Sequence, residues 1–120
     1  MIRGNQAKKD TNFKNKKLLI KDNIIRIGEY FKKFNFVITN GGTTLFENIY
    51  LNNKVYVLPQ TNKEKIISNI FFQKNYIMGF GFQNFYKFDL NKLNNFKIKN
   101  NSIDGKGVYR ILHIINNIFK

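Results

Sequence analysis

The chain has 120 residues, and its 21 Lys and Arg residues against 7 Asp and Glu residues give a formal net charge of +14. This length allows one domain with a core of moderate size, but not two lobes with a cleft between them. The chain contains no cysteine and one histidine, His113, which excludes disulfides, thiol catalysis and a histidine-rich metal cluster. We therefore expect no metal and no other cofactor.

The positive charge suits three classes of partner: nucleic acid, an anionic membrane surface and an anionic small ligand. After an opening cluster between Lys8 and Lys21 the basic residues are scattered, so an ordinary solvated surface is the competing interpretation. No apolar run approaches the roughly 20 residues that span a bilayer, and the N-terminus is too polar for a secretory signal. We expect a cytoplasmic protein.

Residues 1–22 are polar and basic without sustained periodicity, and we interpret them as a truncated N-terminal segment that precedes a domain over residues 23–120. The apolar run at residues 23–27 predicts a short strand. Tyr30, Phe31 and Phe34 then recur at helical spacing, which predicts a short helix over residues 28–35. Residues 36–39 follow as a buried strand.

This strand leads directly into Gly41 and Gly42 and then into a predicted helix over residues 43–51. Two adjacent glycines allow positive φ and a close approach to a ligand, and the free N–H groups of the first helical turn favour a phosphate. The competing interpretation is a capping box, in which Thr44 and Glu47 satisfy backbone donors without any ligand. Both interpretations place a helix start near Thr43.

Strands and helices continue to alternate in the second half. Asn52 and Asn53 tolerate the left-handed conformation that ends helices. We then predict a strand over residues 54–58, which ends at Pro59, and a helix over residues 64–74. A further strand is predicted over residues 76–78, followed by Gly79 and Gly81. This order predicts an α/β fold, a single Rossmann-like domain with a parallel sheet flanked by helices.

Two features near the C-terminus have a functional and a structural interpretation. The Phe- and Tyr-rich stretch at residues 82–101 can stack nucleic-acid bases between cations, although such side chains more often pack a small domain. Asp104 can cap a helix running through Lys120, which has an apolar stripe on one face. His113 falls outside that stripe, so we expect it to face solvent rather than to act in catalysis.

Three predicted loops leave the carboxyl ends of strands, at residues 40–44, 59–63 and 79–81. In open parallel sheets, ligands bind beyond these ends. The loops supply backbone N–H groups, hydroxyls, amides, a carboxylate and a cation, which suit a nucleotide diphosphate joined to a sugar. A carboxylate such as that of Glu47 accepts two hydroxyl hydrogen bonds, as a ribose diol requires.

Residues 37–47, with the sequence Val-Ile-Thr-Asn-Gly-Gly-Thr-Thr-Leu-Phe-Glu, and the later Val-Tyr-Val-Leu-Pro-Gln at residues 55–60 resemble the C-terminal half of GT-B nucleotide-sugar enzymes. The nearest resemblance is to family 28 glycosyltransferases, including the N-acetylglucosaminyltransferase of peptidoglycan synthesis, and to the related UDP-sugar hydrolases of pseudaminic acid and spore-coat polysaccharide pathways. Residues 103–111 resemble the last helix of the hydrolase branch. The resemblance covers roughly residues 24–118.

The resemblance implies a site for the nucleotide-sugar donor. Ile66 and Ile67 stand where the transferases tend to carry sugar-contacting glutamines, which leaves the donor sugar open. We identify no catalytic residue on this chain, because in the family the N-terminal Rossmann-like domain largely contributes the base and the acceptor site. The implied contacts are Asn40, Gly41, Gly42, Thr43 and Thr44 for the diphosphate, Glu47 for the ribose, and Gln60, Asn62, Lys63 and Glu64 for the sugar.

The resemblance thus implies the UDP-sugar-binding half of a hexosyltransferase of cell-envelope or surface-polysaccharide synthesis, incomplete at its N-terminus and dependent on a second Rossmann-like domain on another chain. A UDP-sugar hydrolase shares this donor site and stays open as the second possible reaction. With a membrane-bound acceptor, the basic surface would attract anionic lipid at the inner face of the membrane. Two further hypotheses stay open: a small nucleic-acid-binding protein, which is less favoured, and an inactive remnant.

Overall fold

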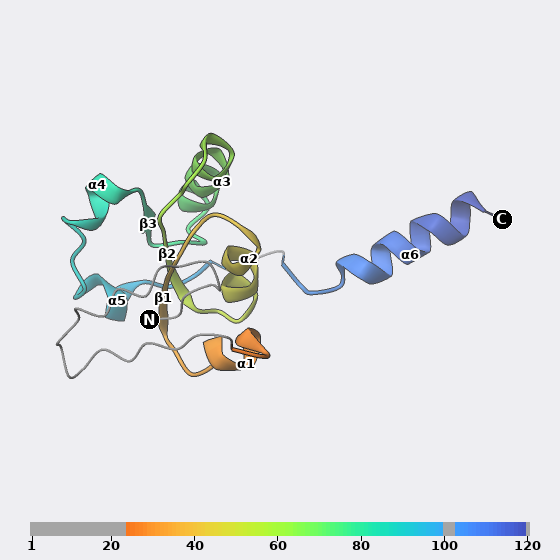
Figure 1. Cartoon of the computed structure of the whole chain (residues 1–120), viewed down its shortest axis with the longest axis horizontal. Helices are drawn as coiled ribbons and strands as arrows, with labels where there is room; N and C mark the ends of the chain where they lie inside the picture. The colour runs from red at the N-terminus through yellow and green to blue at the C-terminus, as the bar shows by residue number, and fades with distance from the viewer. Residues whose placement is uncertain (1–23, 100–102, 120) are drawn as a thin grey trace.

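The computed structural model describes residues 24–99 and 103–119, which form an α/β domain around a three-stranded parallel sheet (Figure 1). Helices connect the strands, as the sequence predicts. In chain order the elements are α1 (Ile27–Phe31), β1 (Phe36–Thr39), α2 (Thr43–Tyr50), β2 (Lys54–Val57), α3 (Asn62–Gln73), β3 (Gly79–Phe80), α4 (Phe82–Phe85), α5 (Lys92–Asn95) and α6 (Gly107–Ile118).

The sheet has the order β1-β2-β3, and both pairs of neighbours are parallel. Val37 lies opposite Val55, and Tyr56 lies opposite Gly79. Because parallel neighbours need a crossover between them, α2 connects β1 to β2 and α3 connects β2 to β3. The predicted fold class, a small Rossmann-like domain with a parallel sheet flanked by helices, is confirmed.

The apolar core lies between the sheet and helices α2 and α3. Val55 and Val57 point to the same face of β2, because side chains alternate along a strand. There they pack against Leu45 and Ile49 of α2 and against Ile77, and all five side chains have no exposed surface. This cluster fixes α2, and therefore its N-terminus, relative to the ends of β1 and β2.

A buried pair of asparagines ties α2 to α1. The Asn48 amide donates to the Thr44 carbonyl at 2.8 Å, and its Oδ1 accepts from Asn53 Nδ2 at 2.8 Å. Asn53 Nδ2 also donates to the Phe31 carbonyl at 3.1 Å. Buried amides cost stability unless they are bonded, and these bonds supply the partners.

Aromatic side chains cover the opposite face of the sheet. The Tyr56 ring lies 5.0 Å from the Phe85 ring and 4.9 Å from the Phe88 ring, and Phe88 stacks on Phe36 of β1. The Tyr56 hydroxyl, on a side chain that is 1% exposed, donates to the Gly81 carbonyl at 3.0 Å. Phe85 and Phe88 are therefore half-buried packing residues of the domain, which favours the structural interpretation of these two residues.

Two predicted strands differ from the structure. The strand expected over residues 23–27 is absent from its described part, residues 24–27, because Arg26 takes a left-handed conformation with φ 59° and helix α1 begins at Ile27. The strand expected at residues 76–78 forms three residues later, as β3. The predicted polar segment at residues 1–22 lies outside the described residues.

Helix α6 follows the sequence expectation with a shifted start. It begins at Gly107, and Asp104 lies before its N-cap residue, Lys106. The Asp104 carboxylate accepts from the Lys106 N–H at 3.0 Å and pairs with Arg110. The Lys106 N–H and then the Arg110 guanidinium lower the pKa of Asp104. Exposed His113 contacts Asn117, as expected for a solvent-facing histidine, and α6 projects away from the sheet (Figure 1).

Candidate functional site

The candidate site lies where β1 and β2 end at a common edge of the sheet. The two strands are parallel, so their carboxyl ends, Thr39 and Val57, lie side by side. The Leu58 N–H extends the ladder by one bond to the Thr39 carbonyl at 2.7 Å. The segment after β1 and the segment after β2 are therefore held next to one another.

Glu64, from the first turn of α3, joins these two segments. One of its carboxylate oxygens, Oε2, accepts from the Gly41 N–H at 3.0 Å and from the Gln60 N–H at 2.8 Å. The Glu64 N–H in turn donates to the hydroxyl of Thr61, the N-cap of α3, at 3.2 Å. Glu64 thus belongs to the candidate site, as the sequence implies, but this oxygen binds the protein's own backbone.

The two glycines of the loop serve a different purpose from the predicted one. Positive φ occurs at neither residue, and Gly42 is extended with φ −82° and ψ −159°. Gly41 is required instead by close packing, because a Cβ at this position would lie 2.6 Å from Glu64 Cβ. The prediction that the glycines provide positive φ is therefore wrong. The group that closely approaches the Gly41 backbone in the structure is Glu64 of the same chain, and the predicted approach of a ligand stays a prediction.

The N-terminus of α2 has no side-chain cap. Its N-cap residue is Gly42, so Thr44 lies inside the first turn and does not form the predicted capping box with Glu47. The Thr-x-x-Glu spacing recurs at Thr61 and Glu64, where the Thr half of such a box is present. This second Thr-x-x-Glu spacing is the pattern in the sequence that could have indicated the structural role of Glu64 at the start of α3.

Backbone donors remain at this helix end. The Gly42 N–H is 3.4 Å from Asn40 Oδ1, and the Gly41 N–H is taken by Glu64. The N–H groups of Thr43 and Thr44 have no acceptor among residues 24–99 and 103–119. These two N–H groups lie at the positive end of the α2 dipole and can donate to a ligand.

The remaining predicted residues lie around this helix end. Glu47 is exposed one turn along α2, and its carboxylate has no hydrogen-bond or ion-pair partner in the described part of the chain. Gln60 is exposed in the connection after β2, and Asn62 and Lys63 are exposed in the first turn of α3. The structure therefore brings the predicted phosphate segment and the predicted sugar segment together through Glu64.

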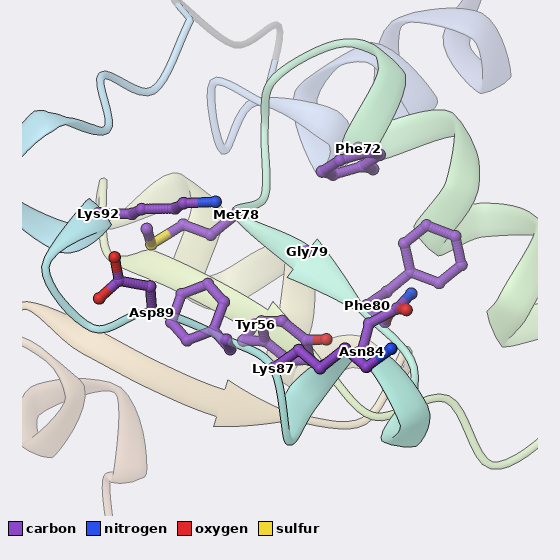
Figure 2. Close-up of a pocket in the computed structure, with 10 residues that line it drawn as sticks. Tyr56, Phe72, Met78, Gly79, Phe80, Asn84, Lys87, Asp89 and Lys92 are labelled. Carbon is purple, nitrogen blue, oxygen red and sulfur yellow. The ribbon is translucent and has the colours of Figure 1, made fainter.

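A separate cavity of about 210 Å³ lies on the aromatic face of the sheet (Figure 2). Tyr56, Gly79 and Phe80 border it, and Lys92 and Asp89 lie at one side. None of the residues predicted to contact the diphosphate, the ribose or the sugar lines it, although Gly79 and Phe80 of the third predicted loop do. Its volume is below the roughly 300–1,000 Å³ of typical small-molecule sites, so we do not assign the ligand to it.

No protein-family model, curated protein sequence or solved structure matches this chain. The candidate site is therefore interpreted from its own geometry. Within the described ranges, no three His, Cys, Asp or Glu side chains are grouped as a metal site would require, and no helix has the length and apolar character needed to cross a membrane. The site offers fixed N–H donors for an anion and a free carboxylate for hydroxyl groups.

Proposed function

We propose that this domain binds a nucleotide sugar, such as a UDP-sugar, at the edge of the sheet where β1 and β2 end. The observation that carries the proposal is the pair of N–H groups of Thr43 and Thr44, which have no acceptor within the described residues and lie at the start of an eight-residue helix. Such donors bind phosphate through hydrogen bonds and through the helix dipole.

Two further features support a ligand with a sugar as well as a phosphate. The carboxylate of Glu47 lies about one turn from Thr43 and has two oxygens for the ribose hydroxyls. The exposed side chains of Gln60, Asn62 and Lys63 supply polar contacts for the sugar that is joined to the diphosphate. Glu64 holds the two loops together in this proposal and carries a negative charge that limits how closely a diphosphate approaches Gly41.

The proposed reaction is hexosyl transfer from the donor, as in the family 28 glycosyltransferases that residues 37–47 resemble. Hydrolysis of the nucleotide sugar is the second candidate reaction, because both reactions begin from the same bound donor. We assign no catalytic residue on this chain. A second Rossmann-like domain on another chain would supply the base and the acceptor site.

Thr43→Pro tests the site because it removes one N–H donor with little change to the helix. Proline is well tolerated at the first helical position, where Thr43 stands, and the extended Gly42 is compatible with a following proline. Thr43→Ala is the matched control, since it lacks the hydroxyl but keeps the N–H. In calorimetric titrations with UDP-N-acetylglucosamine or UDP, we expect Thr43→Pro to bind about 10- to 100-fold more weakly than Thr43→Ala.

Glu47→Ala examines the ribose contact in the same titration. We expect it to weaken binding of UDP but not of inorganic pyrophosphate, which has no hydroxyl groups for Glu47 to accept. Equal affinities of Thr43→Pro and Thr43→Ala would exclude the α2 terminus as the phosphate site. Absence of nucleotide binding together with tight RNA binding, whose affinity falls steeply with salt, would instead favour a nucleic-acid-binding protein.

A further inference from the structure

Helix α6 has a complete apolar face that the domain does not cover. All 12 of its residues, 107–118, are exposed, and none packs into the core. Its large apolar residues form an exposed apolar surface of the kind that marks interaction sites. Their exposed fractions are 66% for Val108, 58% for Ile111, 50% for Leu112, 42% for Ile115 and 70% for Ile118.

The two faces of α6 differ sharply in chemistry. These five residues recur at spacings of three and four, so they form one continuous stripe on the helix, with the exposed Ile114 near its border. Arg110, His113 and Asn117 lie on the opposite face. The segment from residue 105 to residue 120 contains Lys106, Arg110 and Lys120 but no Asp or Glu. A helix with an apolar stripe and a polar face that carries basic rather than acidic residues is typical of segments that lie in the surface of an anionic bilayer.

The helix gains little stability from the domain. Isolated helices shorter than about 12–15 residues are marginal in water, because tertiary packing of the apolar face usually supplies most of their stability. Asp104 contributes at the N-terminal end, where its carboxylate accepts from the Lys106 N–H and pairs with Arg110. A surface that buries the stripe would therefore also complete the folding of α6.

A second copy of the chain fits this face less well than a lipid surface. A 12-residue helix is about 18 Å long, so a pair formed through α6 alone would bury much less than the roughly 1,200–2,000 Å² of a stable interface. Two chains that each carry a net charge of +14 also repel one another. An anionic bilayer needs no complementary groove, and it attracts the same positive charge.

We infer that α6 is a docking helix that lies in the surface of an anionic lipid bilayer, with Val108, Ile111, Leu112, Ile115 and Ile118 inserted between the lipids. The polar face, with Arg110 and His113, stays at the level of the headgroups. This places the domain at a membrane surface through a helix that lies along that surface. The inference does not depend on the ligand of the α2 site, which lies elsewhere on the domain.

Vesicle co-sedimentation of the full chain tests the inference. Vesicles with about three in ten lipids as phosphatidylglycerol, the rest phosphatidylcholine, should bind the protein, and pure phosphatidylcholine should bind it much more weakly. Ile115→Ser should weaken binding to the anionic vesicles at least about tenfold, because it removes apolar surface from the stripe. Asn117→Ser, on the polar face, should stay within about twofold of the unchanged protein.

Circular dichroism supplies a second measurement, in which helical content should rise on addition of anionic vesicles and rise less for Ile115→Ser. Because no core residue comes from α6, both variants should keep the thermal unfolding midpoint of the domain. Equal vesicle binding by Ile115→Ser and Asn117→Ser would overturn the inference, since the basic surface alone would then explain the attraction. Absence of vesicle binding, or a dimer in light scattering that Ile115→Ser dissociates without vesicle binding, would overturn it as well.

Discussion

Replacing Glu64 with alanine removes the oxygen that holds the two loops of the candidate site together. This oxygen accepts from the Gly41 N–H at 3.0 Å and from the Gln60 N–H at 2.8 Å. A bond to an ionised acceptor contributes about 1.5–3 kcal/mol, and the partial exposure of this site reduces the total for the two bonds to about 2–3 kcal/mol. For a domain of this size, the loss corresponds to a fall of roughly 10–20 °C in the unfolding midpoint.

Urea and thermal unfolding followed by circular dichroism measure this loss. Glu64→Gln should cost only about 1 kcal/mol, because its amide oxygen has two lone pairs and can accept the same two N–H groups without the charge. Glu47→Ala is the control, since that exposed carboxylate has no partner within the described residues and its removal should change the free energy of unfolding by less than about 0.5 kcal/mol. If Glu64→Ala is as stable as Glu47→Ala, or if Glu64→Gln costs as much as Glu64→Ala, the bridging role of Oε2 is refuted.

Two further predictions concern buried polar groups. Asn53→Ala leaves the Phe31 carbonyl and Asn48 Oδ1 without the donor that they share, so we expect the free energy of unfolding, measured in urea, to fall by about 2–4 kcal/mol. The control is Asn69→Ala at an exposed position, which should change it by less than about 0.5 kcal/mol. Similar losses for the two variants would contradict the proposed network. Burial raises the pKa of Tyr56, so its contribution to stability is fully present below about pH 10 and is lost as the pH rises through the folded-state pKa. The difference in unfolding free energy between the unchanged protein and Tyr56→Phe should therefore shrink above about pH 10, and a constant difference up to pH 11 would show that the Tyr56 pKa is the same in both states.

The central β-α-β unit could be predicted from the sequence because local preferences and burial agree there. An apolar run forms β1 where expected, and Asn52, in a left-handed conformation with φ 58°, follows the end of α2. The β-branched Val55 and Val57 of β2 contribute to the core. The predicted helix from residue 64 forms as α3, which starts two residues earlier behind Thr61. Each of these elements carries a signal that does not depend on distant residues.

The errors arise where a distant residue decides the local structure. Gly79 looks like the end of a strand, but it begins β3, where it pairs with Tyr56 and the Tyr56 ring leaves no room for a Cβ. Gly41 looks like a residue chosen for unusual dihedral angles, but it is required by the side chain of Glu64, 23 residues away. The sequence locates the candidate site, whereas its internal contacts depend on packing between elements that no local pattern encodes.

The contact between Tyr56 and Gly79 also restricts which substitutions related chains can accept. A Cβ at position 79 would lie 2.7 Å from Tyr56 Cε2, so any larger residue at position 79 requires either a smaller side chain at position 56 or a displacement of the Tyr56 ring. Tyr56 and Gly79 are therefore expected to change as a pair, with a larger residue at 79 accompanied by a smaller one at 56. Among diverged relatives of this chain, such paired exchange of volume would identify those that keep the same register between β2 and β3.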